Sequence, residues 1–171
     1  MKIDLLFSAL AALIPLIIGF IWYNPKIFGT AWMNSAGLTN EKLKGVNMPL
    51  IFGLTFILSF FIAIALHFVV IHQWGAFSAM LTNPNIMESG SDLNTSFLDF
   101  MSKYGTNFRT FKHGALHGAT NGLFFIMPIL AINAMFERKG FKYIAINTGY
   151  WIVSLAIMGG IISQYANVNA F

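Results

Sequence analysis

Four apolar segments limit what this chain can fold into. They lie at about residues 5–23, 50–71, 111–136 and 141–165 of the 171-residue sequence. A helix rises about 1.5 Å per residue, so each segment is long enough to cross a hydrocarbon layer of about 30 Å. Within such a layer the backbone must satisfy its own hydrogen bonds, which favours helices over open sheets or loops. The sequence therefore predicts an all-α protein, a four-helix transmembrane bundle.

The composition is typical of a membrane protein and excludes several classes of function. Charged residues make up only 9% of the chain, whereas a soluble domain contains about 25%. There is no cysteine, which excludes disulfides, thiolate metal sites and cysteine nucleophiles. The net charge is +4, but the ten lysines and arginines are scattered in ones and twos. We therefore expect the lipid bilayer as a partner, and no nucleic acid.

The connections between the segments predict a single polytopic membrane domain, residues 1–171, with one or two short interfacial helices. The aromatic stretch at 27–35 is expected to lie along the membrane interface. The only long connection is 73–110, and it contains an amphipathic pattern with the spacing i, i+3, i+4, i+7, formed by Phe97, Phe100, Met101 and Tyr104. This pattern predicts a short helix on the membrane surface.

The basic residues indicate an orientation in the membrane. Four crossings place both termini and the long connection on one face, which carries Lys2, Lys103, Arg109 and Lys112. The two short connections share the other face, which carries Lys26, Lys42, Lys44, Arg138, Lys139 and Lys142. Basic residues in short loops favour the cytoplasmic side, so we expect short loops in the cytoplasm, with termini and long connection outside. The expected location is a bacterial inner (plasma) membrane.

The same argument places every histidine of the chain at the face of the long connection. The second segment ends there and the third begins there, so all four histidines lie within about two helical turns of that interface: His67, His72, His113 and His117. His113 and His117 are four residues apart and point the same way on a helix. One hypothesis is a metal site of His67, His113 and His117; another is a haem held between His67 and His117.

A plainer interpretation of the histidines is favoured by the sequence alone. Zinc sites usually have three or four ligands, and no carboxylate lies near the histidines on these two segments. In this interpretation His72 and His113 are solvated at the interface, while His67 and His117 form hydrogen bonds between helices. Haem and a metal ion stay open as hypotheses for a cofactor.

A second set of polar residues is expected at the opposite face. It consists of Asn24, Asn133, Glu137 and Asn147. These side chains either line a pocket for a lipid headgroup or small solute, or they cross-link helices by hydrogen bonds. The second interpretation is favoured, because membrane asparagines commonly join helices, with each bond worth about 0.6 kcal/mol.

A stripe of small residues opens the third segment. Gly114, Gly118 and Gly122 recur every four residues, and the fourth segment repeats this spacing with Ala156 and Gly160. Glycines at this spacing let two helix backbones approach closely, either inside one chain or across an oligomer interface. We expect close helix packing here.

The motifs of common enzyme classes are absent from the sequence. There is no Walker A loop, no G-x-S-x-G elbow and no H-E-x-x-H pair. The leading hypothesis is a small polytopic membrane protein without chemistry of its own, with a role in assembly or in binding or passage of a small solute. It is expected to form a homo-oligomer or to be a subunit of a larger membrane complex. The alternative is a haem- or metal-binding redox protein that uses the histidines.

Several motifs resemble one known family. They are WYNP-x-x-FG-x-x-W at residues 22–32, HG…HG at 113–118, NAMFER at 133–138 and N-x-GYW at 147–151. With these motifs the chain resembles the integral-membrane family called domain of unknown function 1761, found in bacteria and fungi. The resemblance implies a small polytopic membrane protein. It implies no particular activity and no catalytic residues.

Overall fold

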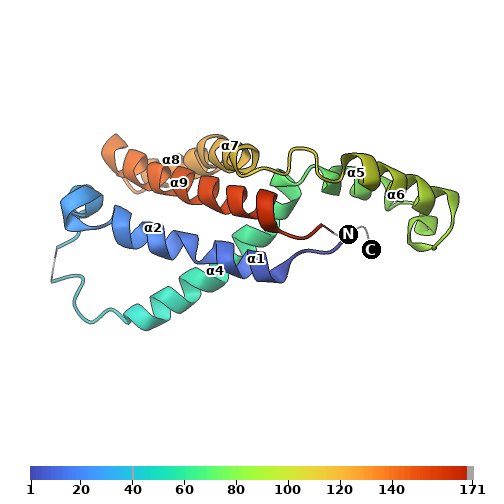
Figure 1. Cartoon of the computed structure of the whole chain (residues 1–171). Coiled ribbons are helices and arrows are strands. Elements are labelled where there is room, and N and C mark those ends of the chain that lie inside the picture. Colours follow the sequence, from blue (N-terminus) through green and yellow to red (C-terminus); the bar gives the residue numbers. More distant parts are fainter. Residues whose placement is uncertain (40, 169–171) are drawn as a thin grey trace.

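The computed structural model describes residues 1–39 and 41–168, and this part of the chain contains helices and no strands. Four helical rods run side by side (Figure 1), which confirms the predicted all-α, four-helix bundle. Each rod is long and apolar enough to cross a membrane, and each begins and ends within two residues of an expected segment. The rods are Leu5–Trp22, Met48–Val70, Phe111–Phe136 and Phe141–Tyr165.

Two of the rods are interrupted near a proline. The first consists of α1 (Leu5–Ala12) and α2 (Ile14–Trp22), with Pro15 in the first turn of α2. The third consists of α7 (Phe111–Asn121), a widened π-helical turn η3 (Gly122–Ile126) and α8 (Met127–Phe136). Proline has no N–H to donate to the preceding turn, so the regular hydrogen-bond pattern breaks at these places. The uninterrupted rods are α4 (Met48–Val70) and α9 (Phe141–Tyr165).

Short helices fill the connections. Between the first two rods lie the π-helical turn η1 (Pro25–Gly29) and α3 (Thr30–Ala36). The long connection contains α5 (Gln73–Met80), the 3₁₀ turn η2 (Pro84–Met87) and α6 (Asp92–Tyr104). α6 begins where the Ser91 hydroxyl accepts a hydrogen bond from the Asn94 amide, at 3.1 Å. Such a bond satisfies one of the free N–H groups at a helix start.

The amphipathic stripe of α6 packs inside a small core of its own. Phe97 is fully buried against Phe77 of α5 and Ile86 of η2, and the rings of Phe77 and Phe97 lie 5.3 Å apart. Phe100 and Met101 are partly buried against this cluster. Figure 1 shows α5 and α6 extending past the end of the bundle where both termini lie. The sequence indicated α6 but gave no indication of α5, whose apolar residues follow no clear period.

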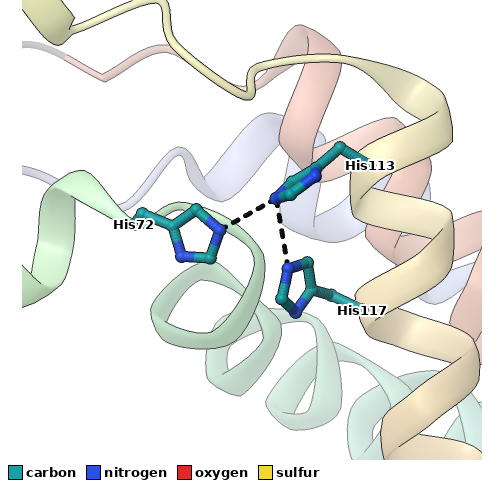
Figure 2. Close-up of side chains that lie close together, drawn as sticks. All are labelled: His72, His113 and His117. Carbon is teal, nitrogen blue, oxygen red and sulfur yellow. Dashed lines mark hydrogen bonds between the residues drawn. The ribbon is translucent and has the colours of Figure 1, made fainter.

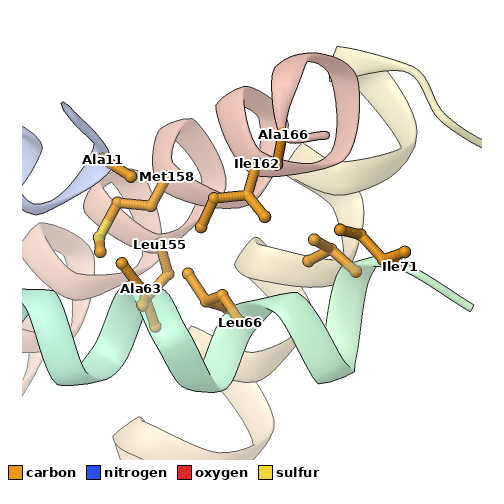
Figure 3. Packing of buried hydrophobic residues seen from close by; sticks show 9 residues of the cluster. Ala11, Ala63, Leu66, Ile71, Leu155, Met158, Ile162 and Ala166 are labelled. Atoms are coloured by element: carbon orange, nitrogen blue, oxygen red, sulfur yellow. The ribbon is translucent and has the colours of Figure 1, made fainter. Parts of the chain in front are cut away.

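α9 lies at the centre of the bundle and contacts the other three rods. Its Leu155, Met158 and Ile162 pack with Ala11 of α1 and Ala63 of α4 (Figure 3). By contrast, large apolar side chains cover the outer surface; Phe20, Phe136 and Phe141 are each more than 80% exposed. A soluble protein rarely exposes so many, so this surface suits contact with lipid.

The glycine stripe packs against α9 within one chain. A Cβ atom on Gly114 would meet the Gly159 carbonyl, and one on Gly118 would meet the Leu155 carbonyl. One on Gly122 would lie 2.8 Å from the Ile152 Cα. The backbones of the third rod and α9 are therefore in direct contact, as small residues at this spacing allow.

Both chain ends lie at the end of the bundle that carries the long connection (Figure 1). The Asp4 Oδ2 accepts hydrogen bonds from the Asn167 backbone amide at 2.9 Å and from its side-chain Nδ2 at 2.7 Å. The Arg109 guanidinium donates to the carbonyls of Ser163 and Ala166 at the end of α9. An even number of rods brings the two ends of the bundle sequence, Asp4 and Asn167, together in this way.

Candidate metal site

Three histidines from two parts of the chain meet at this end of the bundle. Figure 2 shows His72, which follows α4, facing His113 and His117 on the first turns of α7. The His113 Nε2 lies 2.8 Å from the His72 Nε2 and 3.1 Å from the His117 Nε2. One ligand nitrogen from each ring lies within 4.8 Å of the other two.

Local structure explains how the two histidines of α7 come to share one face. α7 begins at Phe111, where the Thr110 hydroxyl accepts a hydrogen bond from the His113 amide at 3.2 Å. This cap sets the helix start, and residues four apart then lie one above the other. His113 and His117 therefore present their rings in the same direction.

His72 reaches the site because α4 ends just before it. The Ile71 backbone is extended (φ −112°, ψ 95°), so the chain leaves the helix there. The next residue, Gln73, is buried and donates from its Nε2 to the carbonyls of Tyr104 (2.8 Å) and Asn107 (3.1 Å). These bonds hold the chain at the residue directly after His72. The Phe108 ring also lies beside the imidazoles, 4.9 Å from that of His113.

Hydrogen bonding among the three rings cannot satisfy all of their facing nitrogens. A neutral imidazole has one N–H and one acceptor nitrogen, so the His113 Nε2 has either one hydrogen or one lone pair to share. It can bond to His72 or to His117, but not well to both. A cation between the rings would accept a lone pair from each nitrogen at once, and the site therefore has the chemistry of a metal-binding site.

The spacing of the nitrogens also suits a metal ion. Imidazole nitrogens bind zinc at about 2.0–2.1 Å, which places two tetrahedral ligands about 3.3 Å apart. The two short separations in the site, 2.8 and 3.1 Å, lie close to this value. His72 is exposed, while His113 and His117 are half-buried. An ion can therefore reach the site from water, and three protein ligands leave one tetrahedral position open.

His67 lies apart from this group. It is fully buried in the last turn of α4, and its Nδ1 lies 2.9 Å from the Ala63 carbonyl oxygen of its own helix. Its Nε2 has no hydrogen-bond partner in the described part of the chain. Of the three histidines expected to bind a metal, the structure joins His113 and His117 and places His72, not His67, as the third. No hydrogen bond joins His67 to His117 among the described residues, and a haem held between these two histidines stays a prediction.

The family model described as "Protein of unknown function (DUF1761)" matches residues 6–163. The chain belongs to this family. The match confirms the resemblance expected from the WYNP and related motifs, and it includes all three clustered histidines. No curated protein and no solved structure matches the chain significantly.

The polar residues expected at the opposite face of this DUF1761 protein have separate roles in the structure. Asn24 caps the turn η1, since its Oδ1 accepts from the Lys26 amide at 2.9 Å. The Asn147 Oδ1 accepts from the Tyr23 hydroxyl at 2.9 Å and so joins α9 to the first rod. Asn133 and Glu137 are exposed at the end of α8. Among the described residues, no hydrogen bond links any two of Asn24, Asn133, Glu137 and Asn147.

Proposed function

We propose that this protein binds one divalent transition-metal ion, such as Zn²⁺, through His72, His113 and His117. The observation that carries the proposal is that three imidazole nitrogens, one from each ring, lie within 4.8 Å of one another. Neutral imidazole is a preferred ligand of zinc, copper and nickel. Binding an ion in this way needs no covalent chemistry, so the function is capture of a small solute at one face of the membrane.

The proposed site faces the outside of the cell. Six basic residues lie in the short connections and four on the face of the histidines, and this bias supports a cytoplasmic location for the short connections of a bacterial inner-membrane protein. Because the chain has no cysteine, a Ser91→Cys variant carries a single thiol in the long connection. Labelling of this thiol by an impermeant maleimide in intact cells supports the proposed orientation. If the thiol is not labelled in intact cells, the opposite orientation is supported.

Cobalt substitution tests the metal site directly. Purified protein, stripped with chelator and titrated with Co²⁺ in detergent, is expected to bind one ion per chain with visible absorption bands typical of a low-coordinate site. His113→Ala should abolish these bands, because it removes the nitrogen that faces both other rings. His67→Gln is the matched control, because it changes a histidine of the same region that lies outside the group.

The variants distinguish the hypotheses. Loss of cobalt binding in His113→Ala and its retention in His67→Gln support the proposed site. Equal loss in both variants, with both still eluting as the wild type does on size exclusion, contradicts it. A Soret band in the purified protein that disappears in His67→Gln supports the haem hypothesis instead.

A further inference from the structure

A second feature lies at the opposite end of the bundle, between α2 and α4. Figure 1 shows the two helices close together near α1 and diverging toward the start of α4. The space between them is a cleft of about 1040 Å³, open along one side. Its walls include Phe20 of α2, Phe52 of α4 and Tyr150 of α9.

The cleft exists because the two halves of the first rod pack on different partners. α1 lies close to α4 through small residues such as Ala11 and Ala63, which belong to the same core cluster. α2 is bound to α9 instead: the Tyr150 hydroxyl donates to the Pro15 carbonyl at 3.0 Å, and the Trp22 Nε1 donates to the Ile146 carbonyl at 3.1 Å. α4 continues without interruption, so a gap opens beyond the break at Leu13.

The chemistry of the walls favours an apolar occupant. Ile17, Phe20 and Phe52 each expose at least half of their surface, and they line the cleft. The two tyrosine hydroxyls that border it are already engaged, Tyr150 with Pro15 and Tyr23 with the Asn147 Oδ1. An apolar site of this kind does not hold ordered water well, whereas a hydrocarbon chain would bury the exposed rings and methylenes.

The depth of the cleft matches one leaflet of a bilayer. It extends along α2 from Tyr23, at the helix end, to Pro15 near the middle of the rod. At about 1.5 Å per residue this is about 12 Å, close to half of the hydrocarbon layer of about 30 Å. Tyr23 and Trp32 meet edge to face at the mouth, with ring centroids 5.1 Å apart. Aromatic residues are typical of the headgroup level.

The charge around the mouth favours an anionic headgroup. Lys26 follows Pro25, which lines the cleft, and Lys26 is exposed. The same end of the bundle carries two acidic residues, Glu41 and Glu137, against six basic ones: Lys26, Lys42, Lys44, Arg138, Lys139 and Lys142. Clusters of basic residues beside a membrane span attract anionic lipids.

We infer that the cleft between α2 and α4 binds one acyl chain of an anionic phospholipid from the leaflet on the short-connection side, with its phosphate near Lys26. The walls supply the apolar contact, and the lysines supply the preference for negative charge. The lipid thus fills the gap that the break in the first rod leaves.

Native mass spectrometry of the full chain, released from bicelles of phosphatidylglycerol and phosphatidylcholine, tests this inference. Thr55→Phe fills the cleft from α4, since Thr55 lines it. Ile57→Phe is the matched control, because Ile57 is exposed on the same helix and is not among the lining residues. We expect one retained phosphatidylglycerol per chain in the wild type and in Ile57→Phe, and a loss of about tenfold in Thr55→Phe. Equal retention by both variants overturns the inference and indicates annular lipid only.

A second measurement leaves the α2 and α4 walls of the cleft unchanged. In nanodiscs, lipids with brominated acyl chains should quench the fluorescence of Trp32. The Trp32 signal is obtained as the difference in emission between the wild type and Trp32→Phe. We expect stronger quenching by brominated phosphatidylglycerol than by brominated phosphatidylcholine, and Lys26→Glu should reduce this preference. Equal quenching by the two lipids in the wild type contradicts the anionic headgroup.

Discussion

The Nε2 atoms of His72 and His113 lie 2.8 Å apart although 41 residues separate them in the sequence. Two distant parts of the chain therefore contribute to one site, and the contact joins the segment that follows α4 to the start of α7. An ion bound there would hold the two rods together as well as occupy the site, so metal binding and stability are coupled.

The affinity for zinc should depend on pH. Imidazole binds a metal ion only in its neutral form, because a proton on the ring nitrogen occupies the lone pair that the ion needs. Zinc titrations at pH 7.5 and pH 5.5 are expected to show at least a tenfold weaker affinity at the lower pH. An affinity that stays constant over this range would indicate ligands other than these imidazoles.

Gly118→Ala should destabilise the bundle. The added Cβ would meet the Leu155 carbonyl, and overpacking of this kind costs about 1–3 kcal/mol of unfolding free energy. Gly53→Ala is the control, because a Cβ on Gly53 of α4 would meet no described atom within 4 Å apart from the neighbouring backbone of its own helix. There the stability should be unchanged or raised by up to about 1 kcal/mol. Thermal unfolding in detergent measures both, and equal effects would contradict the close packing.

Arg109→Met should loosen the end of α9. The guanidinium donates to the carbonyls of Ser163 and Ala166, which lie in the last turn and at the C-cap of α9, where the helix itself supplies no further N–H groups. Losing these bonds should cost about 1–3 kcal/mol and increase hydrogen exchange in the last turn of α9. Lys103→Met is the control: its ion pair with Asp99 is about 60% exposed on both sides, and such pairs contribute little. Similar exchange in the two variants would show that Arg109 does not cap the helix.

The contact between the chain ends should make stability depend on acidity. Burial raises the pKa of Asp4, but hydrogen bonds from Asn167 and Phe7 outweigh it, and the pKa lies below its ordinary value. A lowered pKa in the folded state means that the carboxylate stabilises the fold above the unfolded pKa of about 3.9. This contribution is lost as the pH falls through the folded value. Unfolding measured between pH 6 and pH 3 should show a smaller loss for Asp4→Asn than for the wild type.

Much of the fold was predictable because a long apolar segment in a membrane can adopt few kinds of secondary structure. A segment of 18 or more apolar residues must be a helix there, so the rods were located to within two residues. α5 was not predicted, since it is held by the burial of Phe77 against Ile86 and Phe97. The cleft beside α2 was not predicted either. It depends on which rod each half of the broken helix contacts, and no local pattern contains this information.

By itself, the sequence determined the four rods, their even number and the single end of the bundle at which all four histidines lie, because these follow from hydropathy and segment length. Only the tertiary structure decided which imidazoles meet. His67 is held by the helical phase of α4, where its ring turns inward toward Ala63. His72 lies beyond the end of α4. Because the Ile71 backbone is extended, the direction of the His72 side chain no longer follows the helical repeat, and its ring faces His113. Where a helix ends depends on the packing of the next segment, here through Gln73, and that packing exists only in the folded chain.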